Sequence, residues 1–184
     1  TQWDCEKNGL DLRAQLGIDL RSELRAEDAF SRIPNAAVIP HGQLGAAAVY
    51  IDHFRKSNAQ WSGMALQLPD DSDLVIYNDS HPRTRIRATL MEEFFHITLR
   101  HDRSRIRLLA SGSLERTMDT EVERVAFGSG AAALVPYAGL KELIENGKSV
   151  RTIAAIYEVS SDLISFRMKV TRLYGRYRQA NRQK

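Results

Sequence analysis

The sequence predicts an α+β fold, in which a small antiparallel sheet packs against a helical bundle that ends in a segment like a helix-turn-helix. Two apolar runs, residues 61–68 and 74–77, flank the turn-rich residues 69–73 and predict a β-hairpin. Apolar residues recur at helical spacing through most of the remaining chain. The clearest helix is predicted over residues 85–100, which are apolar except along one narrow stripe.

The composition fits one soluble domain with a substantial core, since 43% of the 184 residues are hydrophobic and 27% are charged. No apolar run approaches the roughly 20 residues of a membrane span, and the first residues lack a signal-peptide profile, so a cytoplasmic location is predicted. The single cysteine, Cys5, excludes an internal disulfide. The net charge of +3 is uneven, because residues 165–184 are basic and contain no acid.

Upstream of the hairpin, the pattern predicts one or two amphipathic helices over residues 10–30 that cover the core. A short strand is predicted at residues 36–40, where prolines confine it to the edge or the end of a sheet. An alanine-rich helix is predicted over residues 44–56, with His53 on its solvent face.

The helix over residues 85–100 follows the hairpin, and Ser80 or Thr84 is predicted to cap it. Its polar stripe covers about 100° of the circumference. The stripe consists of Thr89, Glu92, Glu93, His96 and Arg100. Because charges left alone in low dielectric are costly, these side chains must be paired, bind a metal or line a cleft.

The rest of the chain is predicted to be helical after an exposed basic connection. A helix over residues 118–134 contains small residues that permit another helix to approach closely, and a shorter helix follows at residues 140–147. A helix-turn-helix pattern closes the chain at residues 149–157 and 162–174, with a serine capping its second helix.

Glu92 and His96 lie one helical turn apart, so both side chains can reach one atom outside the helix. That is the geometry of a helix-borne metal site, in which Glu93 would stand beside the ion as a general base. A third ligand must come from another element, and Glu121 and Glu123 are the best sources. The alternative is an ion pair of Glu92 with His96 and no metal.

Several landmarks follow one another in a specific order along residues 36–170. They are a strand ending at Asn78, Arg85-x-Arg87-Ala88-Thr89-Leu90, Glu92-Glu93-x-x-His96, the acidic helix ending at Leu134-Val135-Pro136, and Ile153-Ala154-x-x-Tyr157-x-Val159-Ser160-x-x-x-Ile164-x-x-Arg167. This order resembles the ImmA/IrrE family of metallopeptidases, of the gluzincin type. The resemblance implies a zincin-like fold, in which a sheet packs against a zinc-binding His-Glu-x-x-His helix and a glutamate from the next helix completes the site. We accordingly assign residues 1–148 to a metallopeptidase-like domain and residues 149–184 to a helical segment, with a basic tail, that packs on it.

Carried over by position, the resemblance makes Glu93 the general base and His96 the second histidine ligand. Glu92 stands where the family has its first histidine, so the motif is altered, and Phe95 replaces the glycine before the second histidine. The third ligand is expected at Glu123. Carboxylate and imidazole donors suit zinc or manganese.

Other histidines could supply the missing nitrogen ligand, and the candidates are His41, His81 and His101. His101 would return toward the site if the helix ended at Leu99. Members of the family typically cleave a helix-turn-helix repressor and so switch on stress-response or mobile-element genes. The resemblance therefore implies a regulator or antitoxin protein as the partner. An active enzyme would cleave it, whereas a catalytically degenerate member, which the altered motif favours, would only bind it.

The helix-turn-helix pattern suggests an alternative function, that of a transcriptional regulator that binds DNA. Arg167 and Lys169 lie on its second helix, and the basic tail that follows could contact phosphates. This helix offers few side chains that read base edges, so DNA binding is the weaker hypothesis.

Overall fold

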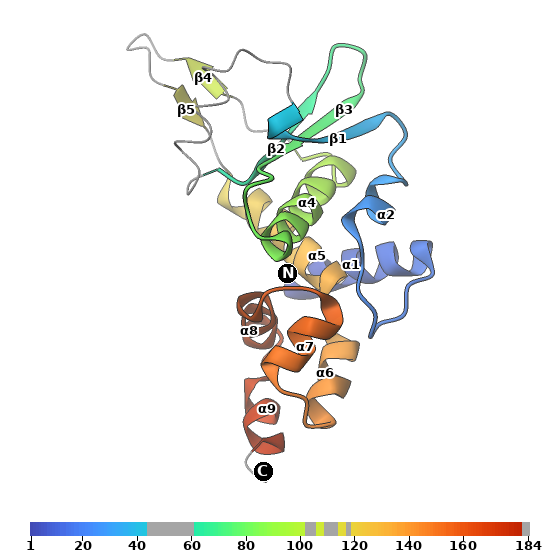
Figure 1. Cartoon of the computed structure of the whole chain (residues 1–184), viewed down its shortest axis with the longest axis vertical. Helices are drawn as coiled ribbons and strands as arrows, with labels where there is room; N and C mark the ends of the chain where they lie inside the picture. The colour runs from blue at the N-terminus through green and yellow to red at the C-terminus, as the bar shows by residue number, and fades with distance from the viewer. Residues whose placement is uncertain (44–60, 102–105, 109–113, 117–118, 182–184) are drawn as a thin grey trace.

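A computed structural model describes residues 1–43, 61–101, 106–108, 114–116 and 119–181 (Figure 1). The predicted helix over residues 44–56, with His53, lies outside the described residues, as does most of the connection after residue 101. Two short strands of that connection are described, β4 (Ile106–Leu108) and β5 (Leu114–Arg116), and they pair in antiparallel fashion. The sequence had not indicated this second hairpin.

Three of the described strands form the main sheet, in the order β1-β3-β2. They are β1 (Ala36–Pro40), β2 (Gly63–Gln67) and β3 (Asp73–Tyr77). β2 and β3 form the predicted antiparallel hairpin, but β1 pairs with β3 in parallel, so the sheet is mixed and not purely antiparallel. A parallel pair needs a connection of a dozen or more residues, and residues 41–72, which connect β1 to β3 and include β2, are long enough. The prediction that β1 is an edge strand is confirmed.

Helices make up most of the remaining described chain (Figure 1). They are α1 (Gln2–Leu16), α2 (Ala26–Phe30), the 3-10 helix η1 (His41–Gln43), α4 (Arg83–Thr98), α5 (Thr120–Leu134), α6 (Tyr137–Glu145), α7 (Val150–Tyr157), α8 (Ser161–Val170) and α9 (Tyr174–Ala180). The predicted α+β fold, with a small sheet against a helical bundle, is confirmed. The cap of α8 is also confirmed, because the Ser160 hydroxyl accepts a hydrogen bond from the backbone amide of Leu163 (3.1 Å).

Several helix bounds differ from the predictions, since α1 already begins at Gln2 and α6 spans Tyr137–Glu145. α4 begins after Pro82 and has no side-chain cap, so the predicted caps Ser80 and Thr84 are wrong. The last predicted helix is divided, because Arg172 adopts a left-handed φ of 59° that separates α8 from α9.

α5 is the central helix of the bundle and lies between α1 and α4 (Figure 1). Its residues 128–133 are buried glycine, serine and alanine residues, and the buried Leu134 follows them. Both neighbouring helices approach closely along this stretch. A Cβ added to Gly9 of α1 would lie 2.5 Å from the backbone nitrogen of Ala133. A Cβ added to Gly130 would lie 3.0 Å from the carbonyl carbon of Met91 in α4. The close approach predicted from the small residues is therefore present.

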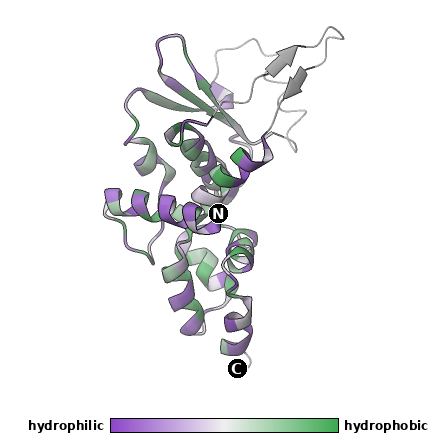
Figure 2. Cartoon of the chain, turned by 180° about the vertical axis from the view of Figure 1, so that it is seen from behind, coloured by the Kyte–Doolittle hydropathy of each residue, from purple (hydrophilic) through white to green (hydrophobic). Residues whose placement is uncertain are grey.

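The core is formed by the sheet and the helices around α5. Its fully buried members include Leu134, Leu140, Ile144, Ile153, Ile164 and Met168. Figure 2 shows hydrophobic residues interleaved with hydrophilic ones along the helices, as amphipathic helices require. Within the described ranges, no helix is both long and apolar enough to cross a membrane.

Two buried arginines meet the C-terminal end of α5. Arg13 of α1 donates from Nε to the carbonyl oxygen of Ala133 (2.5 Å). Arg167 of α8 donates from Nε to the carbonyl oxygen of Val135 (2.8 Å), and its Nη2 donates to the carboxylate of Glu6 in α1. The last carbonyls of a helix lack partners within the helix, and the guanidinium groups provide them here. These bonds connect α1 and α8 to the end of α5.

Candidate metal centre

The polar stripe of α4 lies where this helix meets α5 and the sheet. The other sides of α4 carry apolar side chains that are buried, as predicted. They are Leu90, Met91, Phe94, Phe95 and Ile97. Of the stripe, Glu92 and His96 are half-buried, Thr89 and Glu93 are buried, and Arg100 is exposed. The charged groups therefore lie at a boundary between core and solvent.

α5 brings a third side chain to this stripe. The Asp119 carboxylate caps α5, accepting a hydrogen bond from the backbone amide of Glu121 (2.9 Å). Glu123 precedes Gly130 by seven residues, nearly two turns, and so lies on the same face of α5. Because Gly130 is the point where α5 contacts the backbone of α4, that face turns Glu123 toward the stripe.

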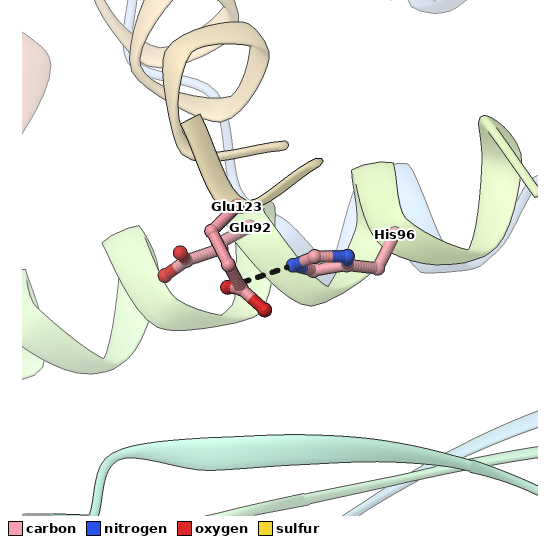
Figure 3. A group of neighbouring side chains, drawn as sticks. All are labelled: Glu92, His96 and Glu123. Carbon is pink, nitrogen blue, oxygen red and sulfur yellow. Dashed lines mark ion pairs between the residues drawn. The ribbon is translucent and has the colours of Figure 1, made fainter. Parts of the chain in front are cut away.

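Glu92, His96 and Glu123 converge on one small volume. Their potential ligand atoms all lie within 4.8 Å of one another, and Nε2 of His96 lies 3.3 Å from Oε2 of Glu123. Figure 3 shows the Glu123 carboxylate reaching down from α5 between the two side chains of α4. All three side chains are half-buried, and they are the one group of three such donors in the described part of the chain.

These donors fit a divalent metal ion. Zinc binds carboxylate oxygen and imidazole nitrogen at about 2.0–2.2 Å, which puts tetrahedral donor atoms roughly 3.3–3.6 Å apart. The separation of 3.3 Å between His96 and Glu123 falls in this range. Two carboxylates held this close repel each other, and a cation between them removes the repulsion. Ligation by these residues stays a prediction, and the geometry is compatible with it.

Glu93, the predicted general base, is a residue of α4 whose side chain lies close to Gly63, the first residue of β2. A Cβ added to Gly63 would lie 2.6 Å from Cγ2 of Thr89 and 3.8 Å from Cγ of Glu93. Glycine at this position therefore lets β2 pass close over the buried side of the stripe. Glu93 is beside the group of three and is not a member of it. This position is compatible with a base, and the role itself stays a prediction.

α4 ends in a turn that reverses the chain. Leu99 is the C-cap, and Arg100 adopts a left-handed φ of 53°. The Arg100 amide donates to the carbonyl of Ile97 (3.0 Å), and the His101 amide donates to that of His96 (3.1 Å). These are the two hydrogen bonds of a Schellman motif. The motif directs the chain back over the last turn of the helix.

His101 consequently returns to the site, as the sequence predicted for a helix that ends at Leu99. Its Nδ1 lies 3.4 Å from Nδ1 of His96, and the two rings are nearly perpendicular. Burial lowers the pKa of His101, while the nearby carboxylates of Glu123 and Asp119 act in the opposite direction. His101 contacts a predicted ligand and does not belong to the group of three.

Other predicted candidates lie elsewhere. Glu121 is exposed and accepts a hydrogen bond from Nε of Arg124 (2.7 Å), so the geometry selects Glu123 over Glu121 as the partner of His96. Nε2 of His81 lies 3.3 Å from the side-chain nitrogen of Asn78, in the loop before α4.

A pair that the sequence did not indicate is formed by His41 and Asp79. Nδ1 of His41 lies 2.6 Å from Oδ1 of Asp79, and the buried ring packs edge-on against Trp61. Gly42 allows this approach, since a Cβ there would lie 3.1 Å from Oδ2 of Asp79. The pair joins the end of β1 to the loop after β3. No local pattern marks it, because its members are 38 positions apart.

Comparison with known families places this site in context. The family model of the IrrE N-terminal-like domain, an M78 peptidase family, matches residues 46–169, which is more than half of the chain. The chain belongs to this family. The resemblance inferred from the sequence is thereby confirmed, and the chain is a metallopeptidase-fold protein. No curated protein and no solved structure matches it significantly.

The IrrE N-terminal-like region contains both helices of the candidate site. It spans α4 and α5, with all three potential ligands, and continues through α7 into the last turn of α8. Peptidases of this family are generally zinc-dependent. The helix-turn-helix pattern is thus part of the region that the family shares. The assigned boundary at residue 148 falls inside the matched region and stays a prediction.

Proposed function

We propose that this chain binds a divalent cation, zinc or manganese, through Glu92, His96 and Glu123, and that it acts there on a protein partner of the regulator or antitoxin class. The convergence of three donor atoms from α4 and α5 within 4.8 Å carries the proposal. Membership of a metallopeptidase family supports it. A helix-turn-helix regulator is the expected partner because of the family resemblance.

Each residue has a defined part in the proposed reaction. Glu92 and His96 on adjacent turns of α4 and Glu123 on α5 hold the ion. When bound, such an ion supplies Lewis-acid polarisation of a carbonyl and acidifies water. Glu93 takes a proton from the attacking water and delivers it to the leaving amide nitrogen. Its burial beneath Gly63 keeps bulk water away from this proton transfer.

The sheet supports a polypeptide as the molecule that binds here. β2 is an edge strand, and among the described strands none pairs with its outer side. It begins beside Glu93, and its exposed residues include Leu66, with Leu68 following it. An extended peptide that adds to this edge would gain backbone hydrogen bonds and run past the site.

Glu92 favours a second candidate, a degenerate member that binds its partner without cutting it. A carboxylate in place of an imidazole gives the set two negative charges, which cancel the charge of a divalent ion. Water on a less positive centre is less acidic, so hydrolysis slows while the site still binds a cation. Oxygen donors also help manganese to compete with zinc for the site.

The metal is tested by dialysing the purified protein against zinc or manganese chloride and measuring bound metal. One ion per chain is expected in the parent, little in His96→Ala and Glu123→Gln, and retained zinc binding in Glu92→His. Glu121→Gln is the matched control, because Glu121 is on the same helix but pairs with Arg124. A parent that takes up neither ion, or a control that loses as much metal as Glu123→Gln, contradicts the proposal.

Catalysis is tested with the metal-loaded protein and helix-turn-helix regulators encoded beside its gene. Cleavage by the parent that Glu93→Gln abolishes identifies a peptidase. Stable capture of one regulator without cleavage, in both parent and Glu93→Gln, identifies the degenerate member. Absence of both cleavage and capture contradicts the proposed partner class.

The structure weakens the alternative of DNA binding. Arg167, which that hypothesis placed on the DNA-reading helix, is completely buried and paired with Glu6. Within α8, Lys169 is then the exposed cation, and Asp162 is an exposed acid. The turn before α8 is also held to α4, because Arg87 donates to the carbonyl of Tyr157 (3.2 Å). Salt-resistant binding to one promoter fragment would restore this hypothesis.

A further inference from the structure

His101 lies against His96 on the side opposite Glu123. We infer that His101 is a positioning residue, whose ring accepts a hydrogen bond from Nδ1 of His96 and so directs Nε2 of His96 toward the metal. The inference rests on the proposed function, because it concerns the metal-bound form of His96. It goes further by assigning a role to a residue outside the group of three.

The two nitrogens of the His96 ring have different partners. Nε2 lies 3.3 Å from Oε2 of Glu123, inside the group of potential ligands. Nδ1 lies 3.4 Å from Nδ1 of His101, with the ring planes at 76° and the centroids 5.3 Å apart. His96 is therefore held between a ligand on one side and an imidazole on the other.

Metal binding fixes where the proton of His96 must lie. A neutral imidazole has one N–H group and one lone pair, and a metal on Nε2 requires the lone pair there. The proton then lies on Nδ1, and such an N–H group needs an acceptor that fixes the tautomer and the ring orientation. Nδ1 of His101 is at hydrogen-bond distance to accept it.

The same pair has a second arrangement without metal. Nε2–H of His96 then donates to Glu123, and Nδ1–H of His101 donates to Nδ1 of His96. An ion on Nε2 of His96 would require the proton of His96 on Nδ1 and, for His101 to accept it, the proton of His101 on Nε2.

The backbone provides a second, independent observation. Arg100 has a φ of 53°, a conformation that costs free energy for any residue with a side chain. In the resulting Schellman motif, the residue after the turn lies over the one five positions earlier, which here places His101 on His96. A glycine at position 100 would adopt the same left-handed conformation without strain. The variant Arg100→Gly therefore keeps His101 in place and removes the backbone strain.

The experiment compares zinc affinity, by competition with a chromophoric chelator, in the parent and three full-length variants. His101→Leu, which removes the acceptor, is expected to bind zinc about 10–100-fold more weakly. His101→Asn, which keeps an acceptor near the same position, should recover most of the loss. Arg100→Gly, which keeps the turn, should bind zinc like the parent. Nitrogen-15 NMR of the His96 ring should show Nδ1 protonated in the zinc-loaded parent.

Parental zinc affinity in a folded His101→Leu variant overturns the inference and leaves the proposed function intact. Equal losses in His101→Leu and His101→Asn also overturn it, because they indicate packing and not hydrogen bonding. A zinc-loaded His96 that carries its proton on Nε2 does the same. If the parent binds neither zinc nor manganese, the proposed function and this inference both fail.

Discussion

The two ends of α5 hold charged side chains in opposite ways. At its C-terminal end, the fully buried Arg13 and Arg167 donate to backbone carbonyls, and Glu6 balances the charge of Arg167. At its N-terminal end, the half-buried Glu123 shares a small volume with the carboxylate of Glu92 and the imidazole of His96. At the C-terminal end Glu6 pairs with a cation, and at the N-terminal end the two carboxylates of Glu92 and Glu123 lie near each other around His96.

This difference indicates what each end contributes. A buried ion pair is costly to break, because the remaining partner is left in low dielectric without compensation. Carboxylates that face each other gain when a cation binds between them. We call the C-terminal end of α5, with Arg13 and Arg167, the closed end, and the N-terminal end, with Glu92, His96 and Glu123, the open end. We expect the closed end to determine the stability of the fold and the open end to determine affinity for a metal.

The largest effect is expected at the closed end, for Arg167→Met. The substitution leaves the Glu6 carboxylate buried without its cation, and the free energy of unfolding should fall by about 3–5 kcal/mol. Urea unfolding followed by circular dichroism measures it. The double variant with Glu6→Gln should regain part of the loss, since an amide still accepts the hydrogen bond from the Tyr137 backbone amide (2.6 Å). A loss below about 1 kcal/mol in the single variant would contradict the assignment.

Zinc should have the next largest effect, at the open end. At a hundredfold excess over its dissociation constant, an ion that binds only the folded state raises the free energy of unfolding by about 2.7 kcal/mol. The same urea experiment with and without zinc measures the change. Glu123→Gln should abolish it, and an equal rise in that variant would place the ion elsewhere.

Gly9→Ala should have a smaller effect on the packing of α1 against α5. The new Cβ would lie 2.5 Å from the backbone nitrogen of Ala133, so a helix must shift, at a cost of about 1–3 kcal/mol. The matched control is Gly175→Ala in α9, where an added Cβ would meet no atom within 4 Å beyond its chain neighbours and its own helix backbone, and stability should hold or rise by up to about 1 kcal/mol. Thermal unfolding compares the two, and equal effects would show that helix propensity and not close approach decides the outcome.

The smallest effect is expected for Glu145→Gln. Nη1 of Arg176 lies 3.0 Å from Oε1 of Glu145, but both side chains are about half exposed. Exposed pairs contribute roughly 0–1 kcal/mol, and salt screens them. Urea unfolding at low and high salt should show a small difference that shrinks with salt. A loss as large as that of Arg167→Met would remove the contrast between buried and exposed pairs.

Local patterns predicted much of the fold. The hairpin, the apolar sides of α4 and the cap at Ser160 each depend on neighbouring residues, and each is present. The parallel pairing of β1 and the burial of Arg167 depend on distant partners. A sequence shows the charge of Arg167 but not the Glu6 carboxylate that meets it from 161 positions away.

The candidate site shows the same division. The one-turn spacing of Glu92 and His96 is visible in the sequence, and it indicated where to look. Choosing between Glu121 and Glu123 required the geometry of two helices, because residues two apart on a helix point about 200° apart. The return of His101 depends on the left-handed turn at Arg100, which no glycine marks.

Anomalous diffraction from crystals grown with zinc would show whether the N-terminal end of α5 is a metal site. We expect one anomalous peak per chain, about 2.0–2.2 Å from Nε2 of His96 and from a carboxylate oxygen of each of Glu92 and Glu123. Zinc crystals without a peak between these three side chains would contradict it.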